Sequence, residues 1–155
     1  NFTSWYSGLD SYLIAHAVNE PITNVSMGRK QEQEDMIPDI KYLPYMTWRE
    51  WINECSKYKV GIHMMRTHAA GTFSMNLAYH STPCLGYGGL DTQDLLHPQT
   101  TVKLGDIRGA QRILKKLYDD KGFYKECSLQ AKELYNTYFE ETQWLKHFKK
   151  ENKLG

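Results

Sequence analysis

The sequence has few cysteines and no long apolar run, and each absence excludes a class of protein. The three cysteines, Cys55, Cys84 and Cys127, are scattered, odd in number and never spaced as CxxC. This pattern argues against a disulfide framework and a zinc site, and favours buried thiols in a reducing compartment. No apolar run approaches the ~18 residues that a transmembrane helix needs, and no signal peptide is visible. We therefore expect a cytoplasmic protein without a metal site.

A strong charge of either sign is also lacking. With 19 Lys and Arg against 18 Asp and Glu, the net charge is only +1, so we expect no nucleic-acid partner and no strong attraction to membranes. A hydrophobic fraction of 41% and a charged fraction of 24% are typical of a globular chain. The 155 residues suffice for one domain, which we expect to span 1–155, with C-terminal helices over 123–155. Because the chain begins with Asn1, we expect a fragment of a longer polypeptide.

The most informative stretch is Val60–Gln93. An apolar run over Val60–Met65 predicts a buried strand, and a loop of mostly small residues, Arg66–Gly71, follows it. A helix is expected from Thr72 to about His80, and a second strand over Pro83–Tyr87. A strand, a loop with glycine, a helix and a strand together form a βαβ unit, whose crossover should be right-handed.

Apolar residues elsewhere recur at spacings that predict further helices and strands. A capping box of Thr47 and Glu50, and an N-cap at Asp106, indicate where two of the helices begin. Helices are expected over Phe2–Val18, Trp48–Ser56, Ile107–Tyr118, Phe123–Phe139 and Thr142–Lys149, and strands over Ile22–Met27, Ile40–Tyr45 and Thr100–Val102. Because strands alternate with helices, the predicted class is α/β, a Rossmann-like three-layer α/β/α fold with a mostly parallel sheet.

Such a sheet places ligands at the carboxyl ends of its strands, beside helix N-termini. The predicted helix at Thr72 would present backbone N–H groups and a partial positive charge there. Gly71 allows close approach, Arg66 adds a charge, and Thr67 and Ser74 add hydroxyls. These residues could seat a phosphate or a diphosphate. They could equally be small and polar residues at a tight turn, since an isolated glycine loop is a weak signal.

The same residues resemble the C-terminal, donor-binding domain of GT-B glycosyltransferases, from about Ile22 to Phe139. Many retaining members carry two glutamates eight positions apart around a glycine, before a small-Thr-Pro sequence. That pattern falls here on His68, Gly71, Asn76 and residues 81–83, with neither glutamate present.

Inverting, plant-type members instead open the loop with Thr-His and close it with Asp-Gln or Glu-Gln. Here Thr67 and His68 open the loop, and Thr92 and Gln93 close it. The stereochemical outcome of transfer stays open between the two patterns. Later features also resemble the family: Asp106 at a helix start, and a turn over 119–124.

The resemblance implies half of a GT-B fold that binds a nucleotide-diphosphate sugar without metal or other cofactor. Loop residues, basic side chains and the polar corner at Asp91 would contact the diphosphate, the ribose and the sugar. The expected donor-binding residues are Arg29, Lys30, Tyr45, Arg66, Thr67, His68, Gly71, Thr72, Phe73, Ser74, Asn76, Asp91, Thr92 and Gln93. The acceptor site and any catalytic base would lie in an N-terminal acceptor-binding domain, through which the protein could also associate with a membrane.

Two other functions remain open at this point. The missing glutamates are consistent with a degenerate, non-catalytic Rossmann-like interaction module. An epimerase that acts on a nucleotide sugar would have the same architecture.

Overall fold

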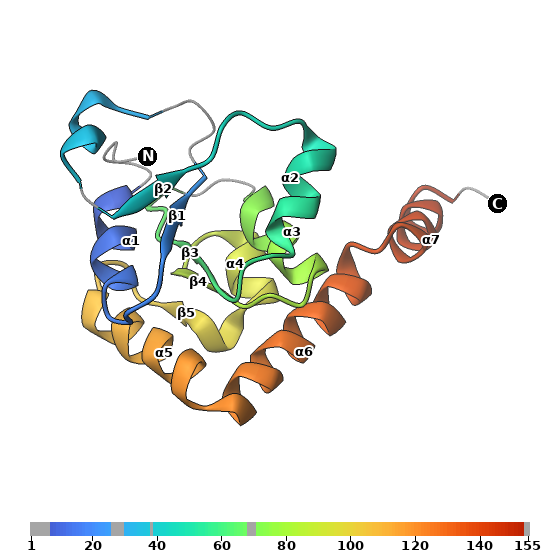
Figure 1. The fold of residues 1–155 in the computed structure, drawn as a ribbon. Helices are drawn as coiled ribbons and strands as arrows, with labels where there is room; N and C mark the ends of the chain where they lie inside the picture. Colours follow the sequence, from blue (N-terminus) through green and yellow to red (C-terminus); the bar gives the residue numbers. More distant parts are fainter. Residues whose placement is uncertain (1–6, 26–29, 38, 68–70, 154–155) are drawn as a thin grey trace.

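Parallel strands alternate with helices along the chain (Figure 1). The computed structural model describes residues 7–25, 30–37, 39–67 and 71–153. The α-helices are α1 (Gly8–Ala15), α2 (Trp48–Cys55), α3 (Thr72–Tyr79), α4 (Asp91–Leu96), α5 (Ile107–Asp119), α6 (Lys121–Tyr138) and α7 (Glu141–Glu151). The strands are β1 (Ile22–Asn24), β2 (Ile40–Tyr42), β3 (Gly61–His63), β4 (Cys84–Tyr87) and β5 (Thr101–Val102). Two 3-10 helices, η1 (Glu32–Met36) and η2 (Pro98–Thr100), precede β2 and β5.

The strands form two parallel sheets. β1 pairs with β2, with Ile22 opposite Ile40. β3, β4 and β5 form a three-stranded sheet in that order, with Gly61 opposite Cys84. Within the described residues, no pairing joins β1 to β3. The parallel α/β class is confirmed, whereas the division into two sheets was not expected.

Neighbouring side chains of β4 show how helices cover both faces of the three-stranded sheet. Leu85 packs among Ile14 of α1 and Leu114 of α5, on one face. Cys84 packs on the opposite face with residues of α2 and α3, among them Trp51 and Leu77. Successive residues of a strand point to opposite faces, so β4 lies at the centre of three layers. Burial of one leucine here contributes about 2 kcal/mol.

Side-chain caps begin several helices where the sequence predicts them. The Thr47 backbone N–H donates to Glu50 Oε2 at 2.7 Å, and Thr47 Oγ1 accepts from the Glu50 N–H at 3.4 Å, which confirms the capping box of α2. Asp106 accepts from the Gly109 N–H at 2.8 Å and caps α5. These contacts satisfy backbone donors that the first turn of a helix leaves free.

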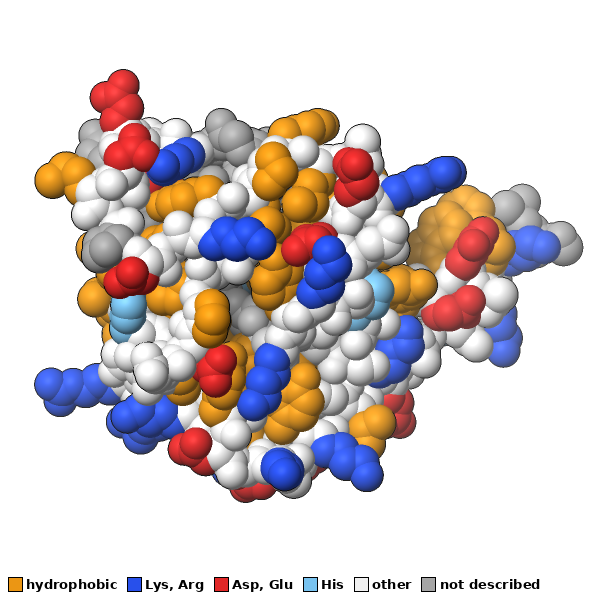
Figure 2. Space-filling view, viewed as in Figure 1, with side chains coloured by type: hydrophobic (Ala, Val, Ile, Leu, Met, Phe, Trp, Pro, Cys, Tyr) orange, Lys and Arg blue, Asp and Glu red, His pale blue; other side chains and the backbone are white. Residues whose placement is uncertain are grey.

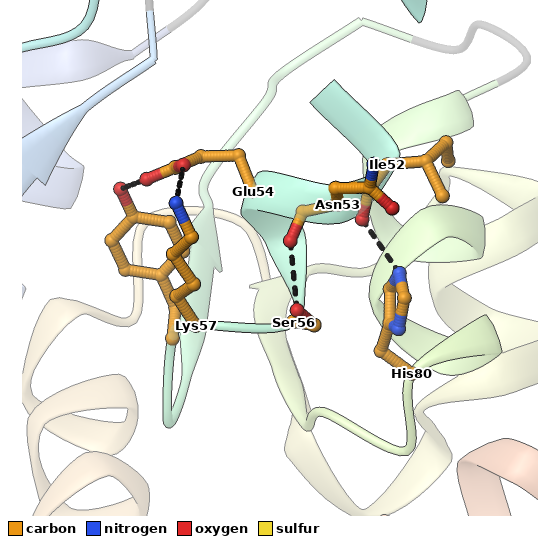
Figure 3. Close-up of polar contacts among 7 residues, drawn as sticks. Ile52, Asn53, Glu54, Ser56, Lys57 and His80 are labelled. Carbon is orange, nitrogen blue, oxygen red and sulfur yellow. Dashed lines mark hydrogen bonds and ion pairs between the residues drawn. The ribbon is translucent and has the colours of Figure 1, made fainter. Parts of the chain in front are cut away.

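Polar contacts also fasten α2 to α3. Figure 3 shows the His80 ring reaching from the end of α3 to the Ile52 carbonyl of α2, 2.7 Å from Nε2. In the same view Ser56 donates to the Asn53 carbonyl at the end of α2. The two helices therefore meet through a hydrogen bond as well as through their apolar faces.

Two C-terminal features complete the fold. α7 follows α6 and stands apart from the body of the molecule, and none of its residues is buried (Figure 1). Trp144 and Phe148 stack on one side of α7 with ring centroids 5.2 Å apart.

Among the described residues, no helix combines the length and the apolar character needed to cross a bilayer. Cys55, Cys84 and Cys127 are all buried free thiols, as predicted.

Candidate functional site

The carboxyl ends of β3 and β4 meet the first turns of α3 and α4, and hydroxyl groups join these turns. Thr92 Oγ1 donates to the Gly71 carbonyl at 2.7 Å, and Ser74 Oγ lies 2.8 Å from Thr92 Oγ1. A Cβ on Gly71 would lie 2.6 Å from Leu90 Cδ2, so a side chain there would require Leu90 to shift. Gly71 is the N-cap of α3, and it brings no side chain to cap the helix.

A charged group lies at the carboxyl end of β3. Arg66 Nη2 donates to Asp10 Oδ2 of α1 at 2.7 Å, and the Tyr87 hydroxyl donates to the same oxygen at 2.9 Å. Asp10 and Tyr87 are buried, while about half of the Arg66 side chain is exposed. Burial, aided by the Asp10 carboxylate, raises the pKa of Tyr87 to about 12. The hydrogen bond that Arg66 donates to Asp10 also raises the pKa of Arg66. Arg66 is therefore held beside the site by a fixed carboxylate, with part of its surface open.

A buried histidine, His97, forms hydrogen bonds to both β4 and α3. His97 Nδ1 accepts from the Cys84 N–H at 3.2 Å, so Nε2 carries the proton and donates to the Ser74 carbonyl at 2.9 Å. Burial lowers the pKa of His97 to about 4. The ring is therefore neutral at pH 7, and it links β4 to the first turn of α3.

The Gln93 side chain is fully buried against β4. Its Nε2 donates to the Cys84 carbonyl at 2.9 Å and to Thr101 Oγ1 at 3.2 Å. A Cβ on Gly86 would lie 2.7 Å from Gln93 Cδ, so the side chain fills the space beside that glycine. The sequence placed Gln93 among the sugar contacts, but a ligand could reach this amide only by displacing its bonds to the sheet.

Asn76 lies one turn after Thr72 on α3, as the helix period predicts. The Asn76 side chain is 3% exposed, and its Nδ2 is a buried donor without a partner within the described part of the chain. Thr72 is exposed, whereas Ser74 is fully buried. An unpaired buried donor costs on the order of 1–3 kcal/mol, so Asn76 holds unused hydrogen-bonding capacity.

The other residues that the sequence predicts to bind the donor are not gathered at one site. Thr67 and Asp91 are exposed at the ends of the β3 and β4 segments. Lys30 forms an ion pair with Asp35, and Tyr45 is 78% exposed after β2. Phe73 turns inward. Its ring stacks on that of Trp51 at 5.9 Å and lies 5.2 Å from that of His63. The predictions for Arg29 and His68 fall outside the described residues.

Sequence reasoning missed three residues that organise this edge: Asp10, Tyr87 and His97. Asp10 falls within the helix predicted over Phe2–Val18, and the sequence predicts no role for Tyr87 or His97. A carboxylate among apolar residues is a weak signal, because its partner Arg66 lies 56 positions away. No local pattern could have identified the pair.

The described residues at this edge are suited to binding an anion. A helix start without a side-chain cap presents N–H groups and a partial positive charge. Arg66 leaves about half of its side chain exposed, although its charge is paired with that of Asp10. Thr72 adds an exposed hydroxyl. No group of three or more His, Cys, Asp or Glu within the described ranges could hold a metal ion.

The comparisons with known proteins rest on structure alone. No protein-family model and no curated protein matches the chain. Among solved structures, sucrose-phosphate synthase from Thermosynechococcus elongatus is similar, with a TM-score of 0.72 and 12% sequence identity. The likeness covers 96% of this chain and 42% of that one, so the chain spans less than half the length of its neighbour. The chain therefore has a glycosyltransferase-like, Rossmann-like fold.

Proposed function

We propose that this chain is the donor-binding part of a glycosyltransferase. It would hold a nucleotide-diphosphate sugar at the start of α3 and take part in glycosyl transfer to an acceptor hydroxyl. The observation that carries the proposal is the first turn of α3, where Gly71 leaves the helix start without a side-chain cap at the carboxyl edge of the sheet. The likeness to sucrose-phosphate synthase supports the fold that this function needs.

The diphosphate would rest against the backbone N–H groups of the first turn of α3 and the hydroxyl of Thr72. Arg66, held by Asp10, would offset part of its charge. The same groups would stabilise the charge that develops on the leaving nucleoside diphosphate. Ser74 and Thr92 would act mainly by fixing the Gly71 carbonyl, since their hydroxyls bond to it and to each other.

The sugar and the nucleoside would lie to either side of the diphosphate. Asp91 is exposed, and its carboxylate is suited to accept hydrogen bonds from sugar hydroxyls. The unpaired Nδ2 of Asn76 is buried, and it would donate to a ribose oxygen if the start of α3 moved to expose it. By the resemblance, His68 would contact a phosphate, Arg29 and Lys30 would offset charge, and Tyr45 would flank the base. An N-terminal acceptor-binding domain would complete the cleft and supply any base, so this chain alone should bind the donor weakly and catalyse no transfer.

Calorimetric titration with UDP-, GDP- and ADP-glucose tests the proposal. We expect one of the three nucleotide sugars to bind, and Arg66→Ala to weaken that binding by roughly tenfold, as the loss of a charge-assisted contact predicts. Arg66→Lys should recover part of the affinity. Arg49→Ala, which removes an exposed arginine from α2, is the matched control and should leave binding unchanged.

Binding that does not change in Arg66→Ala would remove Arg66 from the site, and His68→Ala tests the loop in the same way. A flat titration with all three donors would contradict the proposal. It would favour the non-catalytic module, with which the absence of both family glutamates at His68 and Asn76 is consistent.

A further inference from the structure

A cavity of about 470 Å³ lies where the two sheets face each other without pairing. All three residues of β1 and all three of β3 line it, so it follows the gap between the two strands. Figure 2 shows this face of the molecule hollowed near its centre, with hydrophobic side chains and Lys or Arg side chains around the hollow. A volume of this size is in the range of small-molecule sites.

The walls of the cavity are rich in aromatic rings from different elements. Tyr12 comes from α1, Trp51 from α2, Phe73 from α3 and Tyr118 from α5. Aliphatic side chains of α1, α5, β1 and β3 fill the surface between them. Flat apolar walls favour a ligand with an aromatic body.

The exposed part of the lining lies at the amino ends of the strands. Glu20 precedes β1, and Lys57 and Lys59 precede β3. The cavity therefore opens at the edge of the sheet opposite the first turn of α3. Both lysines are already engaged, because Lys57 pairs with Glu54 (Figure 3) and Lys59 Nζ lies 4.0 Å from the centre of the Tyr118 ring. With one acidic and two engaged basic residues, the entrance favours no charged ligand.

One polar group in the lining has unused hydrogen-bonding capacity. His63, the last residue of β3, lines the cavity. Its Nδ1 has no partner among the described residues and no surface open to the cavity, so a ligand would bond to it once the ring turns. Burial lowers the pKa of His63 to about 4, so the ring is neutral at pH 7. A neutral imidazole can donate one hydrogen bond and accept another, and it offers no charge to an anion.

We propose that this cavity binds a small, uncharged aromatic molecule whose polar group bonds to His63. The site is separate from the proposed nucleotide site, because it opens at the other edge of the sheet. The two sites share one side chain, since Phe73 lies in the first turn of α3 and also lines the cavity. A ligand in the cavity would therefore contact the helix turn on which the diphosphate is proposed to rest.

Ligand-observed NMR with 2-naphthol as the probe tests the site. We expect saturable binding with a dissociation constant on the order of 0.1–1 mM, as ordinary ligand efficiency gives for a molecule of this size. Ala15→Phe, which places a ring in the cavity, should weaken binding by roughly tenfold or more through direct overlap. Val60→Phe makes the same test if Ala15→Phe does not fold. His63→Phe should weaken binding by roughly three- to tenfold, the share of one hydrogen bond.

Leu129→Phe is the matched control, because it adds the same ring at an exposed position of α6 and should leave 2-naphthol binding unchanged. Uridine diphosphate should not displace the probe, and anionic 2-naphthalenesulfonate should bind no more tightly than 2-naphthol. The proposal is overturned if 2-naphthol does not bind the folded chain, if the cavity-filling variants bind it as tightly as the original chain, or if uridine diphosphate competes with it.

Discussion

The three-stranded sheet and the two-stranded sheet are built from similar parallel strands but are held very differently. Every residue of β4 is buried, and side chains of Gln93, His97 and Thr100 bond to the backbone of Cys84. No residue of β1 or β2 is buried. The proposed anion site therefore lies on the buried three-stranded sheet, whereas the cavity lies where the more exposed two-stranded sheet meets it.

The largest difference between the two sheets should appear when core side chains are shortened. Leu85→Ala in β4 should reduce the free energy of unfolding by about 4 kcal/mol, because it removes a fully buried side chain from the first hydrophobic cluster. Ile40→Ala in β2 removes a half-buried side chain of similar size and should cost about 1–2 kcal/mol. Urea denaturation measures both. Equal losses would mean that the two sheets contribute alike.

The next largest effect should come from acid, which acts on the buried His97 and the half-buried His63. His97 has a pKa of about 4 in the folded chain against an ordinary value of 6.5, so the unfolded chain binds the extra proton between these pH values. Stability should therefore fall as the pH drops from 6.5 to 4 and level off below, by up to about 3 kcal/mol for His97. His63, with the same direction of shift, should contribute in the same window.

Single variants separate the two contributions. His97→Gln and His63→Gln should each flatten part of the pH dependence, whatever their effect on stability at pH 7. Urea midpoints at five pH values between 4 and 7 give the slope. A slope that is unchanged in His97→Gln would show that His97 does not titrate as its burial implies.

The smallest expected loss of stability comes from removing the N-cap of a helix. Asp106→Ala removes the N-cap of α5, which packs on the three-stranded sheet, and Thr47→Ala removes that of α2. Each should cost about 1 kcal/mol of global stability, the usual value of a cap. If the α2 region opens before the rest, hydrogen exchange in Thr47→Ala should speed up only around α2, whereas Asp106→Ala should affect the whole chain. Identical exchange patterns would contradict such a difference.

Much of the fold could be predicted because its signals are local. The caps at Thr47 and Asp106 depend on residues three positions apart, and the strand at Val60–Met65 is a short apolar run. The observed strand is shorter, Gly61–His63, since pairing with β4 sets its limits. The sequence analysis predicts no helix over Asp91–Leu96, because six residues are too few to show a helical period.

The rest depends on contacts between distant parts of the chain. Nothing near β1 indicates that it leaves a gap beside β3, since strand pairing is decided by packing across the whole sheet. Gln93 has the chemistry of a sugar contact, and only the three-dimensional structure shows that it lies beneath β4. Arg66 was predicted as a ligand contact, but Asp10, which bonds to it, and Tyr87, which bonds to Asp10, could not be.

The close fit between Gly86 and Gln93 also constrains how related sequences can vary. Any side chain at position 86 would overlap the glutamine, and a shorter residue at position 93 would leave a void and remove one of the two side-chain hydrogen bonds to the Cys84 carbonyl. Neither position should therefore change alone during evolution. Among homologues, a larger residue at 86 should occur together with a smaller one at 93, and this paired variation would identify chains that share the interior of β4.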